Sequence, residues 1–363
     1  MFKTKIGILT FSKENNYGAN LQCYALSKVL QQCGHEVSII DIQLYHTLSF
    51  KSKMVNMIQT YIFDSFRKKH LNLFTKRYPN SEAIKNDPPS ADFFIVGSDQ
   101  VWNYEITSKL DPKIYFFSFL PKGTPRISYA ASFGFDKWEL NEIEDYRQLL
   151  KQFNAISVRE GSGCKICEET FGISATEVLD PTLLLESYDD LCGTYDGSRR
   201  TDNLVCFRLY QNETKLKTLR NFSNEKGMNL VSLFETSFKK DFKVIPFLTV
   251  KQWLNYIRYA KFVVTSSFHC MVFCILFKKS FVVISSRNVK RNERKYNLLQ
   301  KLGLQDRFCP NDSQLESKLS QMFEKKTDYN DVFARLTTLR TSSLDFLLDS
   351  ITQIEEKQND ESI

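Results

Sequence analysis

The stretch KFVVTSSFHCMVFCILFKKSFVVISS (261–286) decides the fold, because its three parts follow the pattern strand, helix, strand. The short apolar runs KFVVTSS (261–267) and SFVVISS (280–286) are typical of buried strands, and the longer segment 268–278 between them is typical of a helix. Two strands joined by a helix lie parallel, and helices cover both faces of a parallel sheet. The stretch therefore predicts a doubly wound α/β fold.

A second unit of the same kind lies near the start of the chain. KIGILTF (5–11) is a short apolar strand, and EVSIIDI (36–42) is the next one. Between them Leu21, Ala25 and Val29 recur at helical spacing. Each half of the chain thus contains a strand-helix-strand unit, which predicts two domains.

Strands and helices alternate on both sides of a polar segment. Further strands are expected at 92–98, 126–132, 154–158, 176–180, 203–210 and 229–235. Further helices are expected at 51–77, 138–152, 160–171, 250–260 and 294–302. The segment ESYDDLCGTYDGSRRTDN (186–203) is polar, has no periodicity and is the expected linker region. We predict two Rossmann-like doubly wound domains facing a cleft, with boundaries at 1–187, 188–203 for the linker, 204–340, and 341–363 for a C-terminal helix and frayed tail.

Length, composition and cysteine usage restrict the class of protein. A length of 363 residues suits two domains, and contents of 42% hydrophobic and 25% charged residues argue against disorder. No apolar run reaches the roughly 18 residues that a membrane span needs, and the start of the sequence does not look like a signal peptide. We expect a cytoplasmic protein, which the nine scattered cysteines also favour. Cys164 and Cys167 form a lone C-x-x-C pair without a second pair at zinc spacing, so we expect no metal.

The net charge of +7 permits an anionic partner but does not select one. The basic stretch RKKHLNLFTKR (67–77) is suited to nucleic acid or to the anionic lipids of the inner membrane leaflet. The solvated face of an amphipathic helix explains the same stretch. No helix-turn-helix or zinc-finger signature is present, so we expect no nucleic-acid partner.

The residues that follow the strands are the candidates for function, because ligands of open α/β sheets bind beyond the carboxyl ends of the strands. No G-x-G-x-x-G or G-x-x-x-x-G-K-[ST] motif is present, so neither a dinucleotide site nor a P-loop is indicated. Candidate binding residues in the first domain are Asn16, Gly18, Gln22, Ser98, Gln100, Trp102, Asn103 and Arg159. Those in the second domain are Arg208, Ser266 and Ser267.

Three of the positions after strands also have a structural explanation. Gly18 opens the first helix, where backbone N–H groups can bind an anion, but a glycine there also suits a tight turn. Asp99 follows a buried strand and is a candidate general base or an N-cap. Arg159 follows a strand and can grip a phosphate or carboxylate with two nitrogens, or it pairs with a neighbouring acid.

His269 is one of four histidines and follows the strand 261–267, in the first turn of the next helix. Imidazole exchanges protons near neutral pH, and a helix N-terminus favours anions. His269 can therefore meet a phosphate oxygen or deliver a proton to a substrate. A buried structural histidine is the alternative interpretation.

Several segments carry a resemblance to one known family. In chain order they are NNYGANLQCYAL, FIVGSDQVWN, ISYAASFG, SVREGSG, VLDPTLLL and TSSFHCMVFCILFKKSFVVI. Together they resemble the polysaccharide pyruvyl transferases over residues 5 to about 303. The combination of N-Y-G-x-x-L-Q-x-Y-A-L with GSDQVWN and the S-F-H block is the most specific part of this resemblance.

The resemblance implies a fold like that of the GT-B glycosyltransferases, with the active site in the interdomain cleft. It implies phosphoenolpyruvate as the donor substrate, without a cofactor, and a glycan or lipid-linked oligosaccharide as the acceptor, in surface or capsular polysaccharide biosynthesis. His269 matches the family's histidine. Relatives carry an arginine shortly before that histidine, where this chain has Ser267 and Phe268, so Arg208 or Arg159 is expected to supply the charge.

Formation of a pyruvate ketal needs a proton donor for the methylene carbon, cationic groups for the anionic donor and a base for the sugar hydroxyl. His269 suits the first role and Asp99 the last, and arginines suit the second. Two other functions remain open at this point. One is a GT-B glycosyltransferase that uses a nucleotide sugar, and the other is a basic protein that binds nucleic acid or a membrane.

Overall fold

The computed structural model describes residues 3–42, 50–71, 73–207, 213–233, 243–286 and 292–360. The chain divides into two compact units. Unit 1 comprises Met1–Asn56, Arg67–Leu185 and Thr338–Ile363, and unit 2 comprises Met57–Phe66 and Glu186–Thr337. The division after Leu185 falls at the start of the polar segment in which we expect the linker.

Unit 1 is built on a seven-stranded sheet with the order β3-β2-β1-β4-β5-β6-β7. All of its strand pairs are parallel. The strands are β1 (Lys5–Leu9), β2 (Glu36–Ile42), β3 (Phe74–Tyr78), β4 (Phe93–Val96), β5 (Arg126–Ala131), β6 (Ala155–Val158) and β7 (Thr176–Glu177). The chain order reverses between β1 and β4, and ligands of doubly wound sheets bind at such a switch point.

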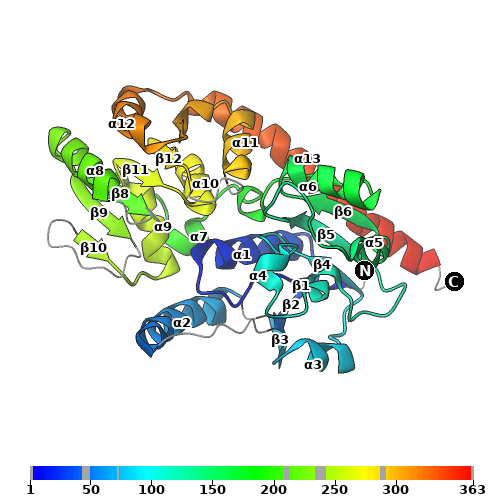
Figure 1. Cartoon of the computed structure of the whole chain (residues 1–363). Coiled ribbons are helices and arrows are strands. Elements are labelled where there is room, and N and C mark those ends of the chain that lie inside the picture. The colour runs from blue at the N-terminus through cyan, green and yellow to red at the C-terminus, as the bar shows by residue number, and fades with distance from the viewer. Residues whose placement is uncertain are drawn as a thin grey trace. The chain divides into compact units, whose positions relative to one another are not determined.

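Helices connect these strands (Figure 1). They are α1 (Tyr17–Gln32), α2 (Phe50–His70), α3 (Ser81–Asn86), α4 (Tyr104–Thr107), α5 (Ile143–Leu150) and α6 (Gly161–Lys165), with the 3-10 segments η1 (Pro112–Phe116) and η3 (Pro181–Leu183) and the π-helical segment η2 (Ile166–Thr170). The middle of α2, Met57–Phe66, is assigned to unit 2. Aromatic side chains fill much of the core, and Trp102 stacks on Phe116 at its centre with 5.0 Å between ring centroids. Many of the 30 phenylalanines of the sequence are thus used in packing.

Unit 2 is built on a six-stranded parallel sheet with the order β10-β9-β8-β11-β12-β13. Its strands are β8 (Asn203–Phe207), β9 (Asn229–Leu233), β10 (Lys243–Ile245), β11 (Phe262–Thr265), β12 (Phe281–Ile284) and β13 (Phe308–Cys309). Its helices are α7 (Asp189–Cys192), α8 (Glu213–Glu225), α9 (Val250–Tyr259), α10 (Phe268–Leu276), α11 (Glu293–Lys301) and α12 (Leu315–Glu324), with the turns η4 (Gly197–Arg199), η6 (Gln305–Arg307) and η7 (Asp312–Gln314). The last helix, α13 (Tyr329–Asp360), begins in unit 2 and ends in unit 1. The prediction of two Rossmann-like doubly wound domains is confirmed.

Three local predictions differ from the structure by more than the exact ends of a helix or strand. The helix expected over 51–77 ends at His70, and Phe74–Tyr78 forms the edge strand β3, because its residues pair with β2 through Asp41 and Ile42. The polar segment 186–203 is not wholly irregular, since α7 and η4 lie in it. α13 continues to Asp360, into the tail for which we predict fraying.

Within the described residues, no helix combines the length and the hydropathy that a bilayer crossing requires.

Candidate functional site

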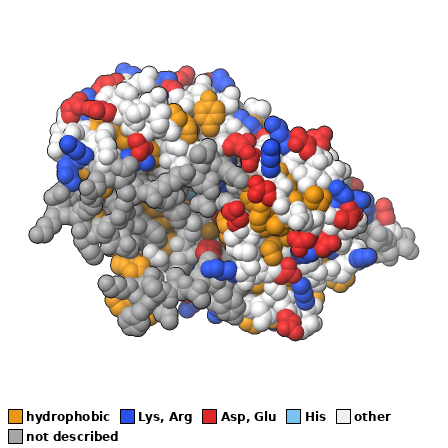
Figure 2. All heavy atoms as spheres, in the orientation of Figure 1, with side chains coloured by type: hydrophobic (Ala, Val, Ile, Leu, Met, Phe, Trp, Pro, Cys, Tyr) orange, Lys and Arg blue, Asp and Glu red, His pale blue; other side chains and the backbone are white. Residues whose placement is uncertain are grey.

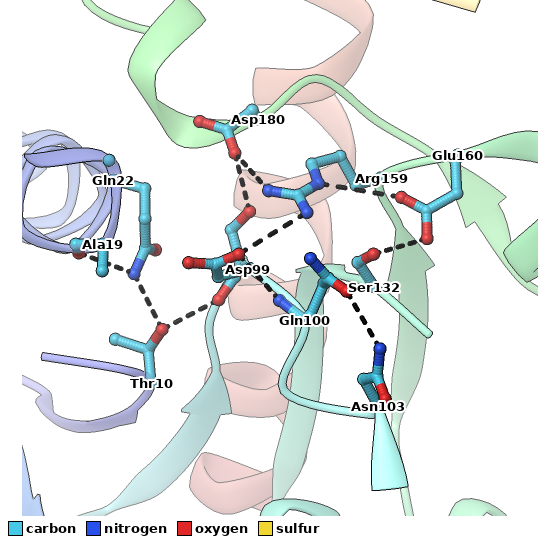
Figure 3. A network of polar contacts seen from close by, with 12 residues as sticks. Thr10, Ala19, Gln22, Asp99, Gln100, Asn103, Ser132, Arg159, Glu160 and Asp180 are labelled. Atoms are coloured by element: carbon cyan, nitrogen blue, oxygen red, sulfur yellow. Dashed lines mark hydrogen bonds and ion pairs between the residues drawn. The ribbon is translucent and has the colours of Figure 1, made fainter. Parts of the chain in front are cut away.

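Polar side chains that follow five strands of unit 1, together with Gln22 of α1, form one connected network at the carboxyl edge of the sheet (Figure 3). The network, here called the strand-end network, comprises Thr10, Gln22, Ser98, Asp99, Gln100, Asn103, Ser132, Arg159, Glu160, Asp180 and Thr182. It lies where the strand order reverses between β1 and β4. The structure therefore brings six of the predicted unit 1 candidates to one sheet edge: Gln22, Ser98, Asp99, Gln100, Asn103 and Arg159.

Arg159, directly after β6, is the centre of the network. Its side chain is 1% exposed, and its Nη1 lies 3.0 Å from Asp180 Oδ2. Its Nη2 is 3.7 Å from Asp99 Oδ1, and its Nε is 3.7 Å from Glu160 Oε2. Burial alone would lower the pKa of Arg159, but the three carboxylates outweigh burial and raise the pKa above its usual value. The ion pair that we held as the structural alternative is thus present, and donor binding by Arg159 stays a prediction.

Asp180 holds two loops together and was not among the candidates named from the sequence. Its Oδ2 accepts hydrogen bonds from Ser98 Oγ at 2.9 Å and from Arg159. Its Oδ1 accepts from the backbone N–H and the hydroxyl of Thr182, at 3.0 and 2.6 Å. The Asp-Pro step at a strand end was the available signal, since Asp180 caps η3 and Pro181 occupies its first position.

Asp99 has a strained backbone, with φ 75 in the left-handed region. A non-glycine residue held there costs about 1–3 kcal/mol and is found often at functional sites. Its side chain is 15% exposed, and Oδ1 accepts from the N–H of Gln100 at 2.9 Å. The following helix α4 is capped by Asn103, so the N-cap explanation for Asp99 does not hold for that helix. Its role as a proton acceptor stays a prediction.

Gln100 and Asn103 shape the loop that follows β4. Asn103 Nδ2 donates to Gln100 Oε1 at 2.9 Å, and both side chains are buried. Gly134 closes over this pair with φ +73, and a Cβ atom there would lie 2.3 Å from Gln100 Oε1. A side chain at position 134 would therefore displace the Gln100–Asn103 pair. Trp102 is 1% exposed and donates from Nε1 to the Tyr115 carbonyl at 2.9 Å, so its place is in the core.

The start of α1 is tied to the same edge. Asn16 is the N-cap, and its Oδ1 accepts from the N–H of Gly18 at 2.9 Å. Gly18 lies inside the first helical turn, so the tight-turn explanation with positive φ does not apply. Gln22 Nε2 donates to Thr10 Oγ1 at 2.8 Å, and that hydroxyl donates to the Ser98 carbonyl at 2.8 Å. These bonds join the loops after β1 and β4.

Unit 2 presents its own strand-end candidates around the start of α10. Ser267 is the N-cap of α10, and its Oγ accepts from the N–H of Cys270 at 3.4 Å. His269 is the second residue of the helix, is 9% exposed, and lies edge-on to the ring of Phe268 with 5.3 Å between centroids. The histidine thus follows the carboxyl end of β11, as predicted, and little of its ring reaches solvent.

Lys295 of α11 is a cation at this edge that sequence reasoning missed. It is 1% exposed, and its Nζ donates to Ser286 Oγ at 2.8 Å and to the Ser266 carbonyl at 3.1 Å. Lys295, Leu298, Leu299 and Leu302 recur at i, i+3, i+4 and i+7, so the lysine occupies the apolar face of the helix. That pattern was the signal that could have identified it.

Asn292 bonds to Ser285 and Ser286, the two described residues directly after β12. Its Oδ1 accepts from the N–H of Ser286 at 2.8 Å, and its Nδ2 donates to Ser285 Oγ at 2.6 Å. Lys295 thereby joins Ser266, after β11, to Ser286, after β12. Arg208, a predicted binding residue, lies outside the described residues.

The candidates belong to two units: Asp99 and Arg159 to unit 1, and His269 and Lys295 to unit 2.

In the part of the chain that the structure describes, no group of three or more His, Cys, Asp and Glu side chains could hold a metal ion. Burial raises the pKa of the Cys167 thiol to about 12, so the C-x-x-C pair offers no ready thiolate at this position.

Comparisons with known proteins agree with this architecture. A family model described as polysaccharide pyruvyl transferase matches residues 16–288. No curated protein matches the chain. Among solved structures, UDP-N-acetylglucosamine 2-epimerase from Rickettsia bellii matches with a TM-score of 0.56 at 9% identity, over 98% of this chain and 98% of that one.

Two further solved structures extend the comparison. A glycosyltransferase from Rickettsia africae ESF-5 has a TM-score of 0.52 at 11% identity, over 98% of this chain and 99% of that one. UDP-GlcNAc 2-epimerase from Methanocaldococcus jannaschii has a TM-score of 0.51 at 11% identity, over 93% of this chain and 99% of that one. At these identities the likeness shows the fold alone, which is a two-domain Rossmann-like fold of the GT-B type.

Proposed function

Because the chain belongs to the polysaccharide pyruvyl transferase family, we propose that this transferase moves the pyruvyl group of phosphoenolpyruvate onto two hydroxyls of a glycan sugar. The product is a pyruvate ketal, and inorganic phosphate is released. The observation that carries the proposal is the placement of His269. It lies in the first turn of α10, shortly after β11, at the strand ends that Lys295 also reaches. An imidazole and a cation at one sheet edge suit a small anionic donor.

The proposed reaction has two stages, and its bonds and protons balance. A proton is added to the methylene carbon of the donor, and a sugar hydroxyl attacks the neighbouring cationic carbon. Phosphate then leaves, a second hydroxyl closes the ring, and the hydroxyl protons pass to a base. His269 is the proposed proton donor, because imidazole transfers protons near neutral pH. Asp99 is the proposed acceptor of a hydroxyl proton.

The neighbouring residues serve these two in different ways. Lys295 positions the loops of Ser266 and Ser286 and adds positive charge to the edge. Ser266 and Ser267 lie at the start of α10, where N–H groups favour the anionic donor. In unit 1, Arg159 holds the carboxylates of Asp99 and Asp180 in place. Arg208 is the further candidate for contact with donor charge.

The proposal also covers the acceptor substrate and the place in the cell where the enzyme acts. We propose a surface or capsular glycan, free or linked to a lipid, as the acceptor, and a cytoplasmic enzyme that acts at the inner face of the membrane. The family name supports a polysaccharide acceptor. Phosphoenolpyruvate is the only donor proposed, and no cofactor or metal takes part in these steps.

The test is a turnover assay on purified protein with phosphoenolpyruvate and a panel of glycan acceptors. Phosphate release and the methyl signal of a ketal in proton NMR are measured together. We expect His269→Gln to lose about two to four orders of magnitude in rate, as removal of a general acid does. His70→Gln is the control, since it changes a histidine at the end of α2. Full turnover in the His269 variant contradicts its proposed role.

A nucleotide-sugar glycosyltransferase is the rival on the same fold. It releases a nucleotide from a sugar nucleotide, whereas the proposed reaction releases phosphate from phosphoenolpyruvate. Both donors are therefore offered in the same assay. Nucleotide release with no phosphate release assigns the chain to the rival activity.

A further inference from the structure

Helix α2 (Phe50–His70) carries an unusual group of exposed hydrophobic side chains. Met54 is 64% exposed, Met57 66%, Ile58 38% and Tyr61 77%, and these four residues are called the apolar stripe. Within the described residues, the other large hydrophobic side chains with such exposure are two tyrosines. Each of those packs against another ring, whereas the apolar stripe is a cluster on one helix. In the orientation of Figure 1, hydrophobic side chains reach the surface over α2 (Figure 2).

The apolar stripe and two lysines occupy one face of the helix. At about 100° per residue, positions 54, 57, 58 and 61 fall within an arc of roughly 120°, and Lys68 and Lys69 fall within the same arc. Both lysines are exposed. Phe63 and Phe66 project on the other side and are buried. The helix therefore has a buried face and, separately, an outward face that is apolar over its middle and basic at its C-terminal end.

The charge of α2 selects the kind of partner. Its sequence FKSKMVNMIQTYIFDSFRKKH contains five lysines and arginines and one aspartate, a net charge of +4. A bare apolar face would suit many partners, but an apolar stripe followed by lysines on the same arc matches an anionic bilayer. There the apolar side chains enter the boundary between headgroups and acyl chains, and the lysines meet phosphates.

We propose that the outward face of α2 binds the surface of an anionic lipid bilayer through Met54, Met57, Ile58 and Tyr61, with Lys68 and Lys69 on the headgroup phosphates. The helix lies along the surface and does not cross it. This inference deepens the proposed function and rests on it for its purpose, because a lipid-linked acceptor is held at that surface. The binding itself needs neither donor nor turnover, which allows it to be tested separately.

The test is co-sedimentation of the full chain with vesicles of phosphatidylglycerol and phosphatidylcholine, compared with pure phosphatidylcholine. We expect binding to the anionic vesicles that weakens as salt is added. Lys68→Gln with Lys69→Gln should weaken the partition about fivefold for each lysine. Met57→Ser with Tyr61→Ser should weaken it by about tenfold or more, because both apolar side chains then leave the interface.

Matched controls separate these effects from general surface changes. Tyr195→Ser removes another exposed tyrosine, and Lys122→Gln removes another exposed lysine. Both should bind vesicles like the wild type. Circular dichroism melting curves establish that every variant is folded before its partition is compared.

Three outcomes overturn the proposal. In the first, the wild type stays in the supernatant with anionic vesicles. In the second, the Met57→Ser, Tyr61→Ser variant binds as well as the wild type. In the third, sedimentation velocity shows a dimer that this variant dissolves, which assigns the stripe to a second copy. Titration with phosphoenolpyruvate keeps the two proposals apart. If the protein binds phosphoenolpyruvate but not the anionic vesicles, only the proposal of a membrane surface is wrong. If it binds the vesicles but not phosphoenolpyruvate, only the proposed function is wrong.

Discussion

Arg159 Nη1 lies 3.0 Å from Asp180 Oδ2, and neither side chain is more than 1% exposed. This pair joins the loops after β6 and β7, and the guanidinium also lies 3.7 Å from Asp99 after β4. One buried cation thus holds three strand ends around the switch point of the unit 1 sheet. Any role of Arg159 toward a substrate is combined with this structural one.

Replacement of Arg159 should therefore affect folding as well as activity. Removing one partner of a buried ion pair leaves an uncompensated charge and costs about 3–5 kcal/mol. We expect Arg159→Ala to lower the free energy of unfolding by that amount in urea titrations. Arg335→Ala is the control, because Arg335 pairs with Asp331 and both side chains are exposed.

The same variant tests donor binding by Arg159. If the arginine also contacts the donor, the KM for phosphoenolpyruvate rises in protein that is still folded. Unchanged stability together with a raised KM contradicts the structural role, and lost stability with an unchanged KM leaves Arg159 as a structural pair only.

Gly134 should tolerate no side chain. Alanine there must adopt φ +73, at about 1–2 kcal/mol, and its Cβ would meet Gln100 Oε1 at 2.3 Å. Gly172→Ala is a matched control, since Gly172 has φ +65 and no atom within 4 Å of its would-be Cβ. We expect Gly134→Ala to be less stable than Gly172→Ala by about 1–3 kcal/mol in urea unfolding. Equal losses would show that the Gln100–Asn103 pair moves aside without cost.

Replacement of the buried Lys295 should lower both the stability of the protein and its turnover. Lys295→Met leaves the Ser266 carbonyl and the Ser286 hydroxyl without their buried donor, at a cost of about 1–3 kcal/mol. We expect lower stability and a lower kcat, because the loops next to His269 lose their anchor. Lys301→Met changes an exposed lysine of the same helix and should alter neither. A Lys295→Met protein with wild-type stability and kcat refutes the positioning role.

Lys279 should give the stability a measurable pH dependence. Burial, with a contribution from Arg200, lowers the pKa of Lys279 to about 8 from 10.5. Between these values the unfolded chain binds a proton that the folded protein does not, so the free energy of unfolding rises with pH in this window. Relative to Lys279→Met, the wild type should gain about 1–2 kcal/mol from pH 8 to 9.5. A constant difference between the two proteins across this range would contradict the lowered pKa.

The sequence predicted the fold better than the details of the site. Strands and helices around 36–42 and 268–278 have strong periodicity, and the parallel sheets follow from their alternation. β3 was missed because the basic residues 67–69 and the segment Phe74–Tyr78 read as one continuous helix. Its pairing with β2 is a tertiary contact, which local periodicity does not contain.

The strand-end positions were predicted from topology alone, since residues after parallel strands gather at one edge. What each side chain does there depends on its partners. Arg159 was equally suited to a ligand or an acid, and only the structure shows Asp180 beside it. Trp102 was expected to bind substrate but packs in the core against Phe116. Lys295 was overlooked because a lysine in a polar helix is usually solvated, whereas this one is 1% exposed.

Isothermal titration calorimetry of the purified protein with phosphoenolpyruvate tests the central claim most directly. UDP and UDP-sugars are titrated in parallel, and His269→Gln is included to relate binding to the strand end of unit 2. The account predicts saturable binding of phosphoenolpyruvate and no binding of the nucleotides. Saturable binding of a UDP-sugar with no binding of phosphoenolpyruvate would contradict it.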